Sequence, residues 1–202
     1  INGWGRSISA SPRCLLIGRV APTAIGTFPM TTTAIVTVLG RDKTGLVSAI
    51  TGALWELGAN LTDTSFSVLG GGADFSAVCE LPVSLDVAEV QQVLAGLELL
   101  SGAEVTVRPY SFDALHGPEG DVTHRITVSG GDQPGLVARL CETFVEFGAN
   151  IVSLNAGPLA EHEGRYVIRL AVSIPEAAAT ACIATVTNTA EALGLACTAE
   201  PS

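Results

Sequence analysis

The sequence predicts an α+β protein built from two copies of one four-stranded module. Three observations support this: a long internal repeat, two amphipathic helical patterns in each copy, and short strand patterns around them. The segment GRDKTGLVSAITGALWELGAN begins at Gly40, and its counterpart GGDQPGLVARLCETFVEFGAN begins 90 residues later at Gly130. A solenoid repeat is at most about 50 residues long. The longer period therefore indicates two small domains, each with its own core.

The first copy predicts its elements in a clear order. Residues 34–39 are a short apolar run, which suits a buried strand, and residues 40–44 form a turn. Apolar residues then recur at helical spacing until Gly58, where glycine can end the helix in a left-handed backbone. The helical stripe consists of Leu46, Ile50, Leu54 and Leu57. Residues 60–69 follow as a second strand, and three glycines make the turn after it.

The rest of the first copy alternates in hydrophobicity and then becomes helical again. Every second residue is apolar in a third strand that ends at Pro82, and these residues are Phe75, Ala77, Cys79 and Leu81. Residues 87–100 form a second helix and residues 103–110 a fourth strand. The second helix has an apolar side made of Val90, Val93, Leu94 and Leu97.

The second copy repeats this order. We expect strands over 122–129, 151–157, 165–174 and 196–199, with helices over 136–147 and 176–193. One face of the third strand is apolar, and it consists of Tyr166, Ile168, Leu170, Val172 and Ile174. A β-α-β-β-α-β unit folds as an antiparallel four-stranded sheet with two helices on one face. The bare face of each sheet is expected to be apolar, which favours pairing of modules or chains.

The remaining segments set the expected boundaries. The patterned sequence starts directly after Met30, the only methionine, so we interpret residues 1–29 as an upstream extension, either disordered or foreign to the native protein. The modules are expected over residues 31–110 and 122–201. Residues 111–121 are rich in glycine, proline and acid, which is typical of a linker.

Composition excludes several classes of function. The net charge is −10, and residues 1–29 carry three arginines and no acid. Such an acidic protein is unsuited to direct contact with nucleic acid or with an anionic membrane surface. The five cysteines show no close spacing, which argues against a zinc or redox site and favours the reducing cytoplasm. No apolar run approaches the roughly 18 residues of a membrane helix.

The candidate binding site is the loop that enters the first helix of each copy. Free backbone N–H groups and the helix dipole at such a loop can hold a carboxylate. The aspartate that opens each loop could receive an ammonium group, so the loop suits an α-amino acid. The alternative is that the two aspartates simply cap their helices. The loop residues are Asp42, Lys43, Thr44, Gly45 and Leu46 in the first copy and Asp132, Gln133, Pro134, Gly135 and Leu136 in the second.

Further candidates begin the strand after the first helix: Asn60 and Leu61, with Asn150 and Ile151 in the second copy. An asparagine side chain donates and accepts hydrogen bonds, so it could contact a ligand in the adjacent loop. It could equally be an asparagine tolerated at a corner. The only lysine of the chain, Lys43, could pair with a ligand carboxylate or simply be solvated.

Signs of catalysis are missing. The sequence contains no GxSxG, GxxxxGK[ST] or HExxH motif. The three histidines, His116, His124 and His162, are scattered without ligand spacing. We therefore expect no catalytic residue, no metal site and no cofactor, and we expect that the protein is not an enzyme.

The two loops resemble the beginning of an ACT domain. VLGRDKTGLV followed by GANL, and VSGGDQPGLV followed by GANI, are similar to the family pattern of a strand, Gly-x-Asp-x-Pro-Gly-Leu, a helix and Gly-x-Asn-Ile. The resemblance covers residues 31–201 and implies two ferredoxin-like ACT domains, with an effector held at domain interfaces by the loop and asparagine regions. Thr44 departs from the proline of the pattern while Pro134 keeps it, so the two sites are expected to differ in affinity or ligand.

A chain of two ACT domains is similar to the glycine cleavage system transcriptional repressor family. The resemblance implies a sensor of a small amino acid such as glycine or serine. It would act on transcription or metabolism through a regulatory partner protein rather than on DNA, and we expect a homodimer. Two alternatives stay open: an interaction module without a ligand, and a detached regulatory subunit of an enzyme of amino-acid metabolism.

Overall fold

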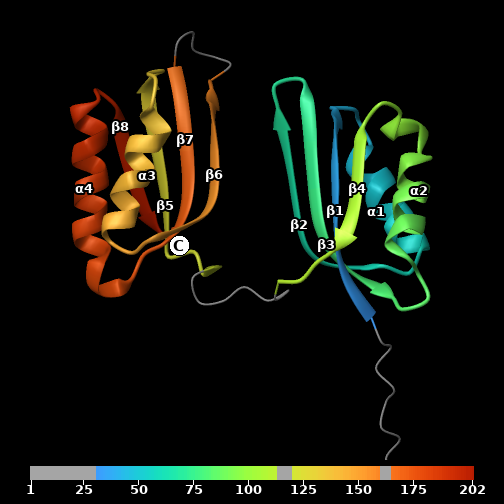
Figure 1. Cartoon of the computed structure of the whole chain (residues 1–202). Helices are drawn as coiled ribbons and strands as arrows, with labels where there is room; N and C mark the ends of the chain where they lie inside the picture. Colours follow the sequence, from blue (N-terminus) through green and yellow to red (C-terminus); the bar gives the residue numbers. More distant parts are fainter. Residues whose placement is uncertain (1–30, 113–119, 160–164) are drawn as a thin grey trace, which may run out of the picture. The chain divides into compact units, whose positions relative to one another are not determined.

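A computed structural model describes residues 31–112, 120–159 and 165–202. The expected extension over 1–29, most of the expected linker, and the turn that holds His162 lie outside the described residues. The chain divides into two compact units, coloured blue to green and yellow to red in Figure 1. Each unit is described by itself.

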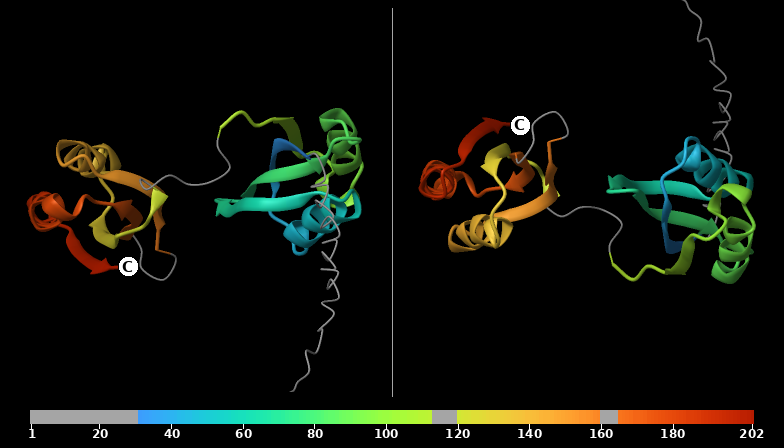
Figure 2. Two further views of the ribbon diagram at one scale, coloured as in Figure 1. Left: turned by 90° about the horizontal axis from the view of Figure 1, so that it is seen from below. Right: turned by 90° about the horizontal axis from the view of Figure 1, so that it is seen from above.

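The first unit is a four-stranded sheet with both helices on one face (Figures 1 and 2). Its strand order is β2-β3-β1-β4, and β1 pairs antiparallel with both β3 and β4. A short 3-10 helix over Glu98–Leu100 precedes the last strand. The elements are β1 (Thr31–Arg41), α1 (Leu46–Glu56), β2 (Asn60–Leu69), β3 (Gly72–Pro82), α2 (Val87–Ala95) and β4 (Glu104–Pro109).

The second unit repeats the first. Its sheet has the order β6-β7-β5-β8, and its helices again cover one face. A bulge between Ile151 and Ser153 shifts the register of β6 against β7. The elements are β5 (His124–Gly131), α3 (Leu136–Glu146), β6 (Asn150–Pro158), β7 (Arg165–Ser173), α4 (Ala179–Ala192) and β8 (Ala196–Pro201). The predicted fold, two antiparallel α+β modules of the β-α-β-β-α-β type, is confirmed.

Each unit has its own core between the sheet and the helices. In the first unit the predicted inward face of β3 is buried, with Phe75, Cys79 and Leu81 at 0% exposure. Leu46, Ile50 and Leu54 of α1 pack onto that face. In the second unit the predicted apolar face of β7 lies in the core with Leu140 and Phe144 of α3. The two repeats therefore bury the same faces.

Two helices differ from the sequence prediction. The helix expected over 87–100 ends at Ala95, because Gly96 is a weak helix former and Leu97 takes an extended backbone. Val93 was expected on its apolar side but is 39% exposed. The helix expected over 176–193 begins as a 3-10 turn over Glu176–Ala178 before α4 starts.

The bare face of each sheet also differs from the expectation. Strand register places mainly polar residues on it, so the expectation of an apolar face is wrong. In the first unit the polar residues include Thr33, Thr37, Asp74, Ser76, Glu80, Glu104, Thr106 and Arg108. In the second unit they include Arg125, Thr127, Asn155, Arg169, Thr198 and Glu200. Water can therefore cover these faces without a large hydrophobic cost.

Exposed apolar side chains occur on strands β1 and β2, where Leu39 is 54% and Leu69 is 64% exposed, and also on the outer surface of the first helix of each unit. Trp55 on α1 is 76% exposed and Val145 on α3 is 77% exposed. These two residues occupy the same place in the repeat, 90 residues apart. An exposed apolar side chain that occurs at equivalent positions of both repeats indicates a contact surface more strongly than a single exposed apolar residue does.

Candidate functional site

The loop before each first helix is organised by a left-handed glycine. Gly45 is the N-cap of α1 with φ 88° and ψ 0°, and Gly135 is the N-cap of α3 with φ 80° and ψ 5°. Glycine adopts this backbone without the Cβ clash that other residues meet. No side chain in the described part of the chain caps either helix. The alternative interpretation, that Asp42 and Asp132 cap these helices, is therefore wrong.

The start of each helix leaves backbone donors available. In α1, the N–H of Leu46 bonds to the Lys43 carbonyl at 3.2 Å, and the N–H of Ala49 bonds to the Gly45 carbonyl at 2.9 Å. Within the described residues, the N–H groups of Val47 and Ser48 have no such acceptor. The corresponding groups in α3 belong to Val137 and Ala138, and they are equally available. Each loop thus presents N–H donors and a positive helix dipole to solvent, which suits an anion.

One side chain in each loop is held by the segment after the second helix. Lys43 donates from Nζ to the Leu99 carbonyl at 2.8 Å, and Gln133 donates from Nε2 to the Leu193 carbonyl at 3.0 Å. The two donors occupy the same place in the repeat although their chemistry differs. Lys43 is therefore neither simply solvated nor fully free for a ligand, because one of its three N–H donors is already engaged.

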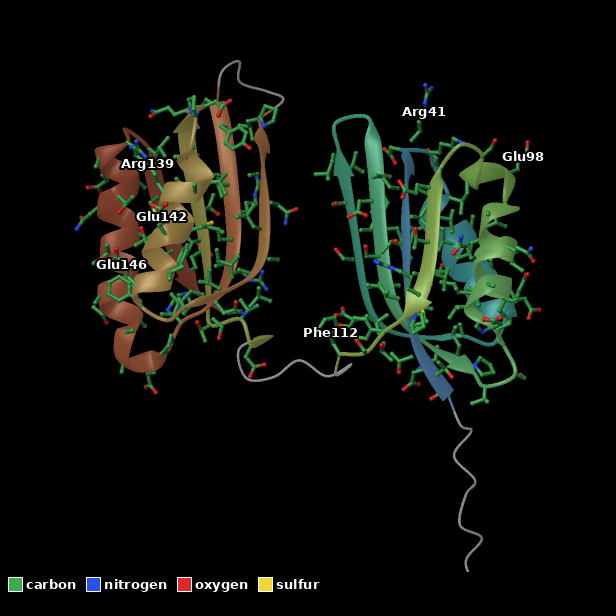
Figure 3. The ribbon with its side chains drawn as sticks, viewed as in Figure 1. Arg41, Glu98, Phe112, Arg139, Glu142 and Glu146 are labelled. Atoms are coloured by element: carbon green, nitrogen blue, oxygen red, sulfur yellow. The ribbon has the colours of Figure 1, made fainter. Side chains whose placement is uncertain are left out.

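The aspartates of the loop lie open to solvent. Asp42 and Asp132 are both exposed, and the backbone N–H of Asp42 bonds to the Gly71 carbonyl of the β2–β3 turn at 3.2 Å. Figure 3 shows Arg41 and Glu98 at this same end of the first unit. Arg41 was not among the residues predicted from the sequence. It adds a second cation to the first loop, where the second unit has Gly131.

The asparagines lie at the other end of each module. Asn60 donates from Nδ2 to Oε2 of Glu80 at 3.2 Å. Asn150 lines a cleft of about 540 Å³ beside the end of α3. The cleft is lined by Val145, Gly148, Ala149, Asn150, Ser173, Ile174 and Pro175. This hollow contains a hydrogen-bonding amide, a hydroxyl and the carbonyl end of a helix.

Loop and asparagine are therefore not adjacent within one module. On β3, Gly72 pairs with the end of β1 and Glu80 meets Asn60, eight residues further along. On β7, Arg165 pairs with the end of β5 and Ser173 with Asn150, again eight residues apart. At about 3.4 Å per residue this separation is roughly 25 Å. The expectation that the asparagine contacts a ligand in the loop of its own module is wrong.

Four of the predicted site residues belong to the cores. Leu46 is 3% exposed and Leu136 is 4% exposed. Leu61 and Ile151 are partly buried and pack against the cores of their units. Leu46 and Leu136 anchor the loops, and Leu61 and Ile151 anchor the strand starts at the other end of each module. The remaining predicted residues of the loops stay exposed, and these are Asp42, Thr44, Gly45, Asp132, Pro134 and Gly135.

The cysteines of the described ranges are buried or half-buried thiols. All four cysteines of the described ranges are free, and burial raises the pKa of the Cys79 thiol to about 11. Burial also raises the pKa of Cys141 and of Cys182. A raised pKa keeps the thiol protonated and unreactive at neutral pH.

Over the described segments, no group of three or more His, Cys, Asp or Glu side chains could hold a metal ion. Nor does any described helix have the length and apolar character to cross a membrane.

The two units define a tandem protein of ferredoxin-like modules, each with a glycine-led loop before its first helix. The profile of the ACT domain family matches the chain twice, over residues 32–107 and 125–200. The chain belongs to the ACT domain family. It is an ACT-domain regulatory protein related to the UPF0237 proteins.

Sequence relatives correspond to one module each. A UPF0237 protein of Streptococcus mutans is 30% identical over 84 residues, which are 41% of this chain and 96% of that protein. A UPF0237 protein of Listeria monocytogenes is 29% identical over 89 residues, again 41% of this chain and 96% of the relative. The family thus includes proteins about as long as a single module of this chain.

Solved structures that cover both modules show the same fold. An unknown protein from Galdieria sulphuraria has a TM-score of 0.67 at 24% identity, over 86% of this chain and 99% of that one. A protein provisionally assigned as a glycine cleavage system transcriptional repressor has a TM-score of 0.59 at 16% identity, over 86% of this chain and 98% of that one. At these identities the likeness concerns the fold.

Proposed function

We propose that the protein senses a small amino acid such as glycine or serine and passes the signal to a partner protein that acts in transcription or metabolism. We further propose that it works in the cytoplasm as a homodimer, without a cofactor, without catalytic activity and without direct contact to nucleic acid. Its membership in the ACT domain family supports the regulatory role. The name given to one structural neighbour, a glycine cleavage repressor, supports the choice of effector.

The observation that carries this proposal is the opposite charge preference of the two ends of each first helix. The N-terminal end offers free N–H groups and a positive dipole, which favour a carboxylate. The C-terminal end has carbonyls, a negative dipole and an asparagine just beyond it. An acid also closes each helix, Glu56 in α1 and Glu146 in α3; Figure 3 labels Glu146 at the end of α3. This second end favours an ammonium group.

An amino acid can contact both kinds of end only if they come from two modules. Within one module they lie roughly 25 Å apart along the sheet. That is several times the length of a small amino acid, because one residue of extended chain spans only about 3.5 Å. A neighbouring module that runs in the opposite direction would place its asparagine beside the loop of the first. The proposed homodimer supplies such neighbours.

The outer surface of each first helix could form this contact. Residues four apart on a helix share one face. The outer stripe consists of Val47, Thr51 and Trp55 on α1 and of Val137, Cys141 and Val145 on α3. Burying the exposed Trp55 would remove a large apolar surface from water. The same exposed tryptophan also favours the second candidate function, an interaction module without a ligand or a detached regulatory subunit of an enzyme.

Calorimetric titration of the full chain with each of the twenty amino acids separates these functions. Saturable binding of one or two small amino acids supports the sensor, and the absence of binding at millimolar concentration favours the interaction module. Asp42→Ala, Asp132→Ala, Asn60→Ala and Asn150→Ala should each lower the number or affinity of sites. Unchanged binding in all four variants would contradict the site assignment.

The number of sites in double variants then identifies which loop works with which asparagine. If the two substituted residues belong to one site, the double variant loses only that site and still binds at the other. If they belong to different sites, the double variant loses both sites. Sedimentation equilibrium of the same samples gives the oligomeric state. A monomer that binds amino acids normally would refute the homodimer while leaving the sensor intact.

A further inference from the structure

A second hollow lies on the bare face of the sheet in the second unit. Its volume is about 240 Å³, and it is lined by residues of three neighbouring strands, β5, β6 and β7. The polar residues around it are Arg125, Thr127, Ser153, Asn155 and Arg169. None of them belongs to the loops or asparagines of the proposed amino-acid sites. The hollow is therefore a separate feature of this module.

Strand register brings the two arginines together. Arg169 on β7 lies directly across from Thr127 on β5 and from Asn155 on β6. Arg125 pairs with Ala171, two residues along β7 from Arg169. Diagonal neighbours of this kind are about 7 to 8 Å apart at their backbones. Two long and exposed side chains at that spacing can place both guanidinium groups on one small ligand.

The charge of this face differs from that of the rest of the molecule. The chain has a net charge of −10, with only ten lysines and arginines. Among the described strand residues of the face, Glu200 is the only acid, and it lies across from Arg125 on β8. No ion pair within the described segments engages Arg125 or Arg169. Two cations are thus left available on an otherwise acidic protein.

The first module shows that the fold itself does not require these arginines. At the register positions of Arg125 and Arg169 it has Ile35 and Ser76. Its bare face carries Arg108 where the second module has Glu200. The arginine pair is therefore particular to the second module, which indicates a role other than holding the sheet together.

The donors around the hollow match a phosphate group. Each guanidinium offers several N–H donors in a planar fork, the amide of Asn155 offers two more, and Ser153 and Thr127 add hydroxyl groups. A carboxylate has only two oxygens to accept them, whereas a phosphate monoester has three terminal oxygens and up to two negative charges. We propose that this face of the second module binds a phosphorylated small molecule, independently of the proposed amino-acid sites.

Titration of the full chain with inorganic phosphate at constant ionic strength tests the proposal. We expect saturable binding at one site per chain, and we expect Arg169→Gln and Arg125→Gln each to weaken it about tenfold, the usual loss for one charge-assisted bond. Glu200→Gln should strengthen binding because it removes the facing negative charge. Arg108 occupies the place of Glu200 in the first module, and Arg108→Gln should leave phosphate binding unchanged.

Several outcomes would overturn the proposal. Absence of saturable binding, equal binding by the Arg169→Gln chain, or an equal loss in the Arg108→Gln control would each do so. Acetate titrated in parallel should bind at least tenfold more weakly, and acetate binding as tight as phosphate would contradict the phosphate assignment. Arginine side-chain NMR gives an independent readout: the Nε resonances of Arg125 and Arg169 should shift, and that of Arg108 should not.

Discussion

Replacing Gly135 by alanine isolates the cost of the left-handed backbone in the candidate loop. Gly135 has φ 80°, and an added Cβ would meet nothing within 4 Å. The substitution therefore adds no packing clash, and its effect comes from the backbone alone. A non-glycine residue in this conformation costs about 1 to 2 kcal/mol. Alanine also lowers the entropy of the unfolded chain, which returns roughly 0.5 kcal/mol.

The net loss in the free energy of unfolding should be about 1 kcal/mol. For a module of this size, such a loss lowers Tm by roughly 4 to 8 °C. Differential scanning calorimetry is the suitable assay because two compact units can unfold in separate transitions. Gly135→Ala should shift the transition of the second unit, and Gly45→Ala, at φ 88°, should shift that of the first.

Two controls make the prediction specific. Asparagine tolerates the left-handed region, so Gly135→Asn should recover most of the lost stability. Gly131 lies four residues earlier, has no positive φ, and an added Cβ there would meet open space. Gly131→Ala should therefore change Tm by less than about 2 °C. If Gly135→Ala is as stable as the unmodified chain, or if Gly135→Asn is no better than alanine, the backbone argument fails.

Three further predictions concern stability and assembly. Burial raises the pKa of the Cys79 thiol to about 11 from its ordinary value of 9.0, so the thiol ionises at lower pH in the unfolded chain than in the folded one. The free energy of unfolding should therefore fall by up to about 2 kcal/mol between pH 9 and 11. Urea unfolding of a Cys79→Ala chain should show a smaller fall over that range. Gly40→Ala should cost about 1 to 3 kcal/mol in urea unfolding, because its Cβ would lie 2.7 Å from that of Ala103. Gly52 lies within α1 with open space around it, so Gly52→Ala should raise the free energy of unfolding by up to about 1 kcal/mol. A stabilising Gly40→Ala together with a destabilising Gly52→Ala would show that packing at these glycines does not decide the outcome. Trp55→Ser should weaken the proposed homodimer in sedimentation equilibrium, and an unchanged association constant would exclude the outer helix stripe as its contact.

The sequence predicted the elements well because the same pattern occurs twice. The helical stripe that begins at Leu46 and the alternation that begins at Phe75 each depend on which residues face the core, and these faces are buried as expected. The helix predicted to reach Leu100 ends earlier because hydrophobic spacing alone gives little weight to Gly96. The prediction of an apolar bare face was wrong because it assumed that a face without helices must be covered by another module. It did not consider that polar residues such as Thr37 and Ser76 alternate with the core residues along the strands.

The candidate site was predicted less well than the fold. The left-handed glycines and exposed aspartates could be inferred from loop composition. The opposite placement of loop and asparagine was implied by chain order, because a helix that follows a strand returns the chain to the end where that strand began. The bond from Lys43 to the Leu99 carbonyl, and the contact of Asn60 with Glu80, join residues far apart in sequence. One sequence carries no pattern that pairs such residues.

The bond between each loop and the segment after the second helix has a consequence for how the two copies diverge. Lys43 and Gln133 make the same connection with different donors, so the copies can exchange a charged residue for a neutral one and keep the connection. Together with Arg41, which stands where the second unit has Gly131, this gives the first loop two more positive charges than the second. If both loops bind the proposed effector, two sites of different affinity on one chain would respond over a wider range of effector concentration than two identical ones. The duplicated module would then give a graded response in place of a single threshold.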